Sequence, residues 1–145
     1  MKPILTDSEL LEYIPQRPPI VMIDALYYAS ASSSKTGLTI DEDNLFLQNG
    51  KMSTMGLIEN IAQTAAISAG YFYKSNNQPV KIGFIGSVKQ LEVVHWPNVG
   101  DQIITEIKEI QEVMNIKIIE GIIYLNDDKI ASCEMKIFIL DEAPD

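Results

Sequence analysis

The segment from Ser53 to Tyr73 is apolar or small at nearly every position, and Glu59 is its only charged residue. A segment that is apolar around most of its circumference predicts a helix that is buried on most faces. Ser53 is a suitable N-cap, and the polar run that ends at Pro79 stops the helix near Tyr73. At about 1.5 Å per residue the helix is about 30 Å long, the diameter of a small domain. We therefore expect it to form a central rod.

After Pro79 the pattern changes to that of successive strands separated by turn signals. The expected strands are Val80 to Val94, Gln102 to Val113, Ile116 to Asn126 and Lys129 to Leu140. Asn126-Asp127-Asp128 predicts a hairpin turn, and Met114-Asn115 is a weaker turn signal. In the first of these strands, Gly83 and Gly86 indicate a bulge or a place where another backbone or a ligand comes close.

The chain before the long helix predicts one short helix, two strands and a loop. Thr6-Asp7-Ser8-Glu9 has the spacing of a capping box, so we expect a helix that runs to about Ile14. Prolines at positions 15, 18 and 19 prevent its continuation. The remaining expected elements are a strand from Ile20 to Ser30, a serine-rich turn, an antiparallel strand from Lys35 to Asp41, and a polar loop from Asp41 to Lys51.

Two strands, one long buried helix and a further run of antiparallel strands predict an α+β fold. A sheet that covers so apolar a helix must curl around it, which describes the hotdog architecture. Small residues are expected to let the sheet approach the helix closely: Gly56, Ala62, Ala65, Ala66, Ala69 and Gly70. We expect a single domain over residues 1–145, with a frayed acidic tail at 141–145.

Composition narrows the range of partners and compartments. The chain has 145 residues, of which 46% are hydrophobic, enough for one buried core. The net charge of −9 and the pI near 4.5 argue against nucleic acid. An acidic carrier protein would also be repelled at long range, unless basic groups such as Arg17, Lys51, Lys81 and Lys89 gather into a patch.

The apolar part of the long helix is too short for a membrane span, which needs about 20 apolar residues. A lone cysteine, Cys133, excludes an internal disulfide, and no secretory signal pattern opens the chain. These observations predict a protein of the reducing cytoplasm.

Four stretches together resemble the beta-hydroxyacyl-acyl-carrier-protein dehydratases. They are Ile14-Pro15-Gln16-Arg17-Pro18-Pro19-Ile20-Val21-Met22-Ile23-Asp24, Glu59-Asn60-Ile61-Ala62-Gln63, Gly83-Phe84-Ile85-Gly86 and Pro97-Asn98-Val99-Gly100-Asp101. Their order and spacing match that family over most of the chain. The resemblance implies that Glu59 matches a helix carboxylate which, with a histidine from the preceding loop, moves protons across a dimer interface as water leaves a beta-hydroxyacyl thioester.

The loop histidine does not carry over, because the chain has none between Asp41 and Ser53. The amides of Gln48 and Asn49 in this loop cannot transfer protons near neutral pH and can only position substrate or water. The shortened loop is similar to that of a divergent branch associated with aryl polyene and flexirubin pigment clusters. The resemblance therefore implies an acyl-carrier-protein or coenzyme A thioester as substrate, and either a homodimer or a heterodimer with a histidine-bearing dehydratase.

Each candidate residue also has a structural interpretation. Glu59 can be a carboxylate held by Gln63 one turn later, and we expect Gln63 to orient Glu59 rather than to catalyse. His95, two positions before Pro97 at a strand end, is expected to be solvated or structurally bonded, and Cys133 to be inert. A single histidine also argues against a metal site, and no cofactor is expected.

Two groups of residues are expected to contact the substrate. Thr54, Met55 and Gly56 begin the long helix, where free N–H groups can bind a thioester carbonyl. Gly83, Phe84 and Gly86 can let an acyl thioester lie along the strand. The leading hypothesis is a dehydratase-like protein, which can be half of a heterodimer. The alternatives are a hotdog thioesterase that uses Glu59, or a non-catalytic subunit that binds an acyl chain or a partner.

Overall fold

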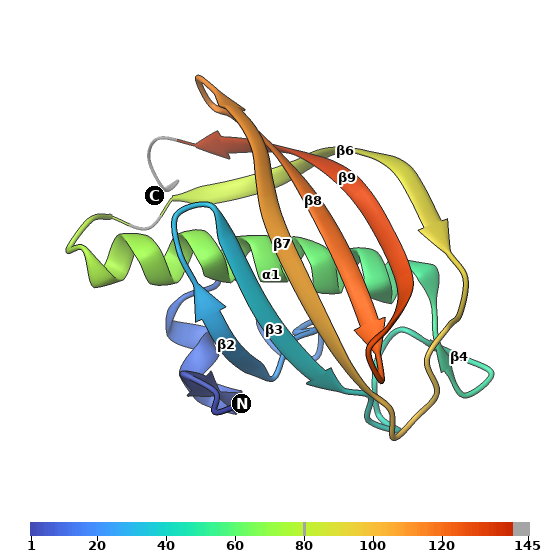
Figure 1. Cartoon of the computed structure of the whole chain (residues 1–145). Helices are drawn as coiled ribbons and strands as arrows, with labels where there is room; N and C mark the ends of the chain where they lie inside the picture. Colours follow the sequence, from blue (N-terminus) through green and yellow to red (C-terminus); the bar gives the residue numbers. More distant parts are fainter. Residues whose placement is uncertain (80, 141–145) are drawn as a thin grey trace.

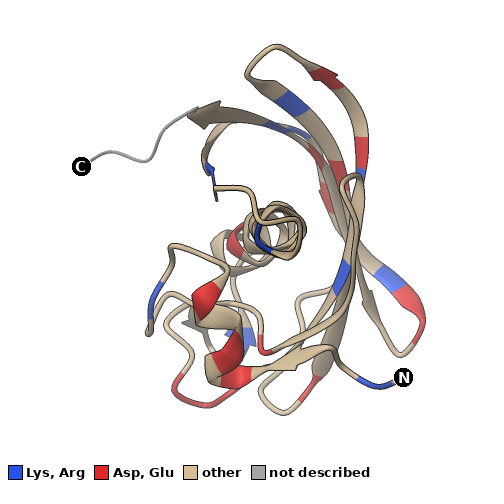
Figure 2. Cartoon of the chain, turned by 90° about the vertical axis from the view of Figure 1, so that its left-hand side faces the viewer, with Lys and Arg blue, Asp and Glu red and all other residues tan. Residues whose placement is uncertain are grey.

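The computed structural model describes residues 1–79 and 81–140, in which a curved sheet wraps around one long helix, α1 (Thr54–Ser75) (Figure 1). Figure 2 views this helix end-on, inside the curve of the sheet. In spatial order the sheet contains β1 (Leu5–Thr6), β2 (Ala25–Ala29), β3 (Ser33–Thr39), β7 (Gln102–Val113), β8 (Ile116–Leu125), β9 (Asp128–Leu140) and β6 (Ile82–Val93), with every pairing antiparallel. The α+β hotdog prediction is confirmed.

The second half of the chain follows the predicted pattern closely. The turn between β8 and β9 places Asn126 and Asp127 at φ of 51° and 69°, as a two-residue hairpin requires. Met114, at φ 56°, supplies the left-handed residue of the weaker turn. The predicted start of the β6 strand at Val80 and the predicted frayed tail at 141–145 lie outside the described residues.

Gly86 is a β-bulge, where the pairing register of β6 with β9 shifts between Ile85 and Ser87. A side chain at this position would collide with the ring of Phe138 on β9. The glycine therefore lets an aromatic ring pack over the bend that turns β6 along the helix.

The helix predicted from Thr6 to Ile14 is wrong in type and length. The structure has the short strand β1 and then a 3-10 helix, η1 (Asp7–Glu12), although Glu9 does accept a hydrogen bond from the Thr6 N–H at 3.0 Å. Ile14 precedes a proline, which disfavours the helical conformation, so the helix stops before it. The chain then packs so tightly on α1 that a methyl group at Gly70 would strike the Tyr13 carbonyl.

The strand predicted from Ile20 to Ser30 is shorter, because only Ala25–Ala29 (β2) pairs with β3. The residues just before β2 have their backbone groups hydrogen-bonded by two side chains of α1 instead of by a neighbouring strand. Gln63 accepts from the Met22 N–H at 2.6 Å and donates to the Ile20 carbonyl at 2.9 Å. Asn60 donates to the Met22 carbonyl at 2.8 Å. This segment is therefore tied to the helix rather than to the sheet.

The polar loop predicted from Asp41 to Lys51 contains a small hairpin, β4 (Leu47–Gln48) and β5 (Lys51–Met52). Asn49 and Gly50 form its turn at φ of 53° and 77°. An Asn-Gly pair is the strongest short-range hairpin signal, so this element was readable from the sequence.

The helix is buried on one side only, which corrects the prediction of burial on most faces. Leu57 and Ile61 are fully buried in the main core against the sheet, and Ile67 is fully buried in a second cluster with Leu10 of η1 and Leu26 of β2. The close approach comes from a glycine of the sheet, since a methyl group at Gly121 would lie 2.5 Å from Ile61. Most of the small residues of α1 that were expected to meet the sheet lie on another face: Ala62, Ala65, Ala66 and Ala69 line a cavity.

Buried polar side chains fasten the helix to the sheet. Thr64 and Thr36 share a hydrogen bond of 2.8 Å between their hydroxyls, and Ser34 donates to the Thr64 carbonyl at 2.9 Å. The Thr105 hydroxyl donates to Asn60. Because every one of these groups is buried and paired, the network specifies the position of the helix along the sheet.

Asp24, the last residue of the Pro-rich motif, has a structural position. Its carboxylate accepts from the Thr39 N–H at 2.8 Å, and its carbonyl accepts from the Asp7 N–H at 2.9 Å. Burial raises the pKa of the Asp24 carboxyl, while the bond from Thr39 opposes this rise. The motif thus links η1 to the start of the sheet.

Cys133 is expected to be unreactive in the folded protein. The side chain is 3% exposed in the main core, and burial raises the pKa of its thiol to about 11. At pH 8 only about one thiol in a thousand is then ionised. A disulfide reagent such as DTNB at pH 8 should label the native chain far more slowly than the chain in guanidinium. Equal rates would contradict the burial of this residue.

Candidate functional site

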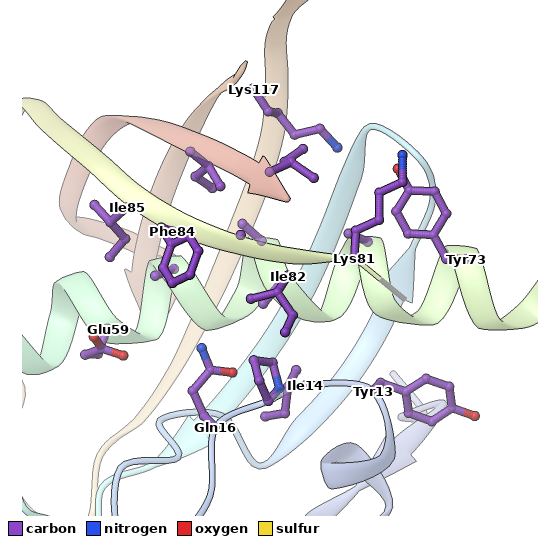
Figure 3. A pocket seen from close by; sticks show the side chains of 18 of the residues that line it. Tyr13, Ile14, Gln16, Glu59, Tyr73, Lys81, Ile82, Phe84, Ile85 and Lys117 are labelled. Carbon is purple, nitrogen blue, oxygen red and sulfur yellow. The ribbon is translucent and has the colours of Figure 1, made fainter. Parts of the chain in front are cut away.

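A trough of about 550 Å³ runs along the face of α1 that the sheet leaves uncovered (Figure 3). Its walls are the helix, the edge strand β6 with nearby residues of β9 and β8, and the segment from the end of η1 to Gln16. The lining is mainly apolar and includes Ile14, Ala62, Ala65, Ala66, Ala69, Ile82, Ile137 and Ile139. Concave apolar sites with a few polar groups are typical of ligand-binding pockets.

Helical spacing brings one line of residues to this trough. Glu59, Ala62, Ala66, Ala69 and Tyr73 are separated alternately by three and four positions, so they lie along one face of the helix. Glu59 lies at one end of this line and Tyr73 at the other. The trough therefore has a carboxylate at one end and a long narrow floor of alanines.

Glu59 is half-buried at the wall of the trough, not enclosed in the core as the sequence predicted. One of its carboxylate oxygens accepts a hydrogen bond of 3.0 Å from the Gln63 side chain. The hydrogen bond from Gln63 thus orients the carboxylate, which lies next to the cavity (Figure 3).

The amide of Gln63 is locked at both ends. It is fully buried, its oxygen is bonded to the Met22 N–H, and its nitrogen is shared between the Ile20 carbonyl and Glu59. The bonds to the backbone fix the orientation of the amide, so only its N–H side can face the carboxylate. The predicted contact between Gln63 and Glu59 is present.

Gln16 also lines the trough, and the sequence reasoning did not select it. Its amide oxygen is buried without a hydrogen-bond partner within the described residues. Figure 3 shows the amide between the loop that carries it and β6, with its nitrogen directed toward Phe84 in this view. Unlike Gln63, this amide is not locked by the protein. The only available signal was its place in the Pro-rich motif.

The residues expected to bind substrate divide into two groups. Gly83 and Phe84 line the trough, whereas Gly86 does not and instead packs beneath Phe138. The start of α1 lies outside the trough lining; there the Gly56 N–H donates to the Ser53 hydroxyl at 3.4 Å, and the Thr54 hydroxyl accepts from Trp96 at 3.0 Å.

Other candidates do not line the trough. Met55 lies one helical turn before Glu59 and is 58% exposed, outside the trough lining. Gln48 and Asn49 are exposed on the β4–β5 hairpin, also outside the lining. His95 is exposed beyond the end of β6. Among the residues that line the trough, no imidazole accompanies the carboxylate.

Comparison with known proteins agrees with this geometry. A family described as ApeP-like, ApeP dehydratase, matches residues 8–144. The chain belongs to this family of dehydratases. The ApeP-like match spans the Pro-rich motif, the helix with Glu59 and the whole main sheet after β1, so all walls of the trough lie within it.

Individual relatives are consistent with membership of this family. The chain is 25% identical over 142 residues to the 3-hydroxyacyl-[acyl-carrier-protein] dehydratase FabZ of Pediococcus pentosaceus, covering 94% of this chain and 93% of the relative. Its fold is similar to the structure of the dehydratase heterocomplex ApeI:P from Xenorhabdus doucetiae, with a TM-score of 0.84 at 15% identity over 98% of this chain and 93% of that one.

A hypothetical thioesterase from Streptococcus pneumoniae, solved with coenzyme A, also shares the fold of this ApeP-like chain. Its TM-score is 0.66 at 6% identity, covering 82% of this chain and 87% of that chain. Within the described residues, no helix has the length and hydropathy needed to cross a membrane.

Proposed function

We propose that this chain is the histidine-lacking subunit of a heteromeric dehydratase that acts on 3-hydroxyacyl thioesters of acyl-carrier protein or coenzyme A. The observation that carries the proposal is Glu59, held by Gln63 at the wall of an apolar trough whose lining contains no histidine. The membership of the ApeP-like family and the similarity to FabZ support the reaction class.

Dehydration needs two proton-transfer groups. A base takes the proton from C2 of the acyl chain, and an acid gives a proton to the 3-hydroxyl as the C3–O bond breaks, so that water and a 2-enoyl thioester are released. One carboxylate and one imidazole can divide these tasks. In the proposal, Glu59 supplies the carboxylate and a partner subunit supplies the imidazole.

The edge of the sheet supports a partner. In the described chain β6 pairs only with β9, so its other edge is free. Large apolar side chains on and after this strand are exposed, including Phe84 at 53%, Ile85 at 42% and Val94 at 74%. A long edge strand with exposed apolar side chains is a template for pairing with another chain. The fold relative ApeI:P is itself described as a heterocomplex.

Reconstitution tests the proposal. The purified chain alone should not convert a 3-hydroxyacyl carrier thioester into the 2-enoyl product, whereas the chain mixed with a histidine-bearing dehydratase from the same organism should do so. Product is measured by mass spectrometry of the carrier. If the partner alone is as fast as the mixture, this chain is not a catalytic half.

A thioesterase is the second candidate, because a helix carboxylate without a histidine, such as Glu59, can serve as a base or nucleophile for hydrolysis. The same mixtures can be assayed for release of free thiol. Thiol release by the chain alone, without enoyl product, would favour hydrolysis over dehydration.

A further inference from the structure

The end of the trough farthest from Glu59 differs chemically from its floor. Lys81, Lys117 and Tyr73 line this end, beyond the alanines (Figure 3). We propose, building on the proposed function, that Lys81 and Lys117 form a binding site for an anionic group carried on the substrate about 20 Å from the reacting carbon.

The length of the trough sets this distance. Glu59 and Tyr73 are 14 positions apart on α1, which corresponds to about 21 Å at about 1.5 Å per residue. The wall between them offers methyl and methylene groups, so it suits an extended chain without charges. A charged group on such a chain can be buried at low free-energy cost only where the trough becomes polar, at the end lined by Lys81 and Lys117.

Neither of the two lysines is in a salt bridge with a described residue. Among the described residues the one ion pair is Lys35 with Glu106, so neither Lys81 nor Lys117 has a carboxylate within 4.0 Å. The Lys81 ammonium lies 5.6 Å from the centre of the Tyr73 ring, a contact that places the charge without neutralising it. A nearby anion would therefore have two ammonium groups to bind.

Other charged groups near this end bring the local charge close to zero. Lys74 is engaged locally, since it donates to the Glu12 carbonyl at 3.1 Å and lies 5.0 Å from the Tyr13 ring centre. The carboxylates are Glu12 at the rim, Glu112, the cross-strand neighbour of Lys117, and Glu109, where burial raises the pKa of the carboxyl and the Lys117 charge opposes that rise. Three lysines thus face three carboxylates, a local balance near zero in a chain whose net charge is −9. Figure 2 shows this end of the molecule facing the viewer.

Two substrate features can place an anion at this position. If the acyl chain occupies the trough, the anion is a group at its far end, such as a carboxylate, after about 16 carbons at about 1.3 Å each. If the carrier arm occupies the trough, the anion is the phosphate of 4′-phosphopantetheine. Both use the same chemistry at Lys81 and Lys117, and experiment distinguishes them.

Binding of unreactive thioether analogues tests the site without turnover. One pair compares a hexadecyl chain on N-acetylcysteamine with and without a terminal carboxylate. The other compares a butyl chain on pantetheine with and without the 4′-phosphate. Dissociation constants are measured by calorimetry for the reconstituted complex with wild-type chain, with the double variant Lys81→Gln and Lys117→Gln, and with Lys89→Gln. Lys89 is an exposed lysine of β6 outside the lining and serves as the matched control.

We expect the wild type and Lys89→Gln to prefer the anionic member of one pair about tenfold, and the double variant to lose this preference to within about twofold. Preference in the first pair assigns the anion to the acyl chain, and preference in the second assigns it to the carrier phosphate. No preference in either pair, or a preference that survives in the double variant, overturns the site. Because no turnover is measured, loss of dehydration alone would refute the proposed function without refuting this site.

Discussion

Replacing Glu59 with glutamine in the reconstituted complex is expected to lower the rate of dehydration by about 10²- to 10⁴-fold, the usual contribution of a positioned proton-transfer group. Glutamine has nearly the same shape and still presents an oxygen to the Gln63 N–H, so the contact of 3.0 Å can be kept. It cannot take up or release a proton near neutral pH. The measurement is enoyl product formation, with kcat and KM determined separately.

The size of the effect separates the candidate functions. A loss in kcat with little change in KM is expected if Glu59 acts on the reacting atoms rather than in binding. Glu12→Gln is the matched control, because Glu12 lines the opposite end of the same trough. Unchanged dehydration in Glu59→Gln would indicate a non-catalytic subunit, and selective loss of thiol release would indicate a thioesterase.

Replacing Gln63 with methionine is expected to reduce the free energy of unfolding by about 2–4 kcal/mol. The Met22 N–H and the Ile20 carbonyl both lose their hydrogen-bond partner, and each buried group left unpaired costs about 1–3 kcal/mol. These bonds measure 2.6 Å and 2.9 Å in the structure. The segment before β2 has no strand partner to replace them. Equilibrium unfolding in urea measures the change.

Gln16→Met provides a matched comparison, because it exchanges the same pair of residue types at a glutamine that lines the trough. The Gln16 amide oxygen is buried without a partner, so its removal leaves no broken hydrogen bond. We expect a change in unfolding free energy within about 0.5 kcal/mol, or a gain in stability. If Gln63→Met and Gln16→Met lose the same unfolding free energy, the hydrogen bonds of Gln63 to Met22 and Ile20 are not the cause of the loss in Gln63→Met.

Much of the candidate site was predictable where one local element carries it. Glu59 and Gln63 are four positions apart on one helix, so their contact follows from helical geometry alone. Gly83 and Phe84 follow from the strand pattern and lie in the trough as expected. The predicted roles of Gln48 and Asn49 depended on how separate segments meet, and within this chain both lie outside the trough lining. The start of α1 is one turn before Glu59 and is also outside the lining.

The sequence by itself determined the elements whose signals are local. Ser53 as N-cap, the turn at Asn126-Asp127 and the strands on either side of it each depend on residues a few positions apart, so backbone conformation and period suffice to predict them. The same reasoning extended to Ile20–Ser30 was wrong, because Gln63 and Asn60, some 40 positions away, compete for the backbone groups of that segment.

Only the tertiary structure decided which face of α1 is covered. The apolar pattern of the helix is nearly uniform, so it could not show that Leu57 and Ile61 meet the sheet while Ala62 and Ala66 line an open trough. That choice is made by buried polar partners, Asn60 and Thr64 with Thr105 and Thr36, which fit the sheet in one rotation of the helix. The same rotation places Glu59 on the wall of a cavity that Gln16 and Lys81, from distant segments, also line.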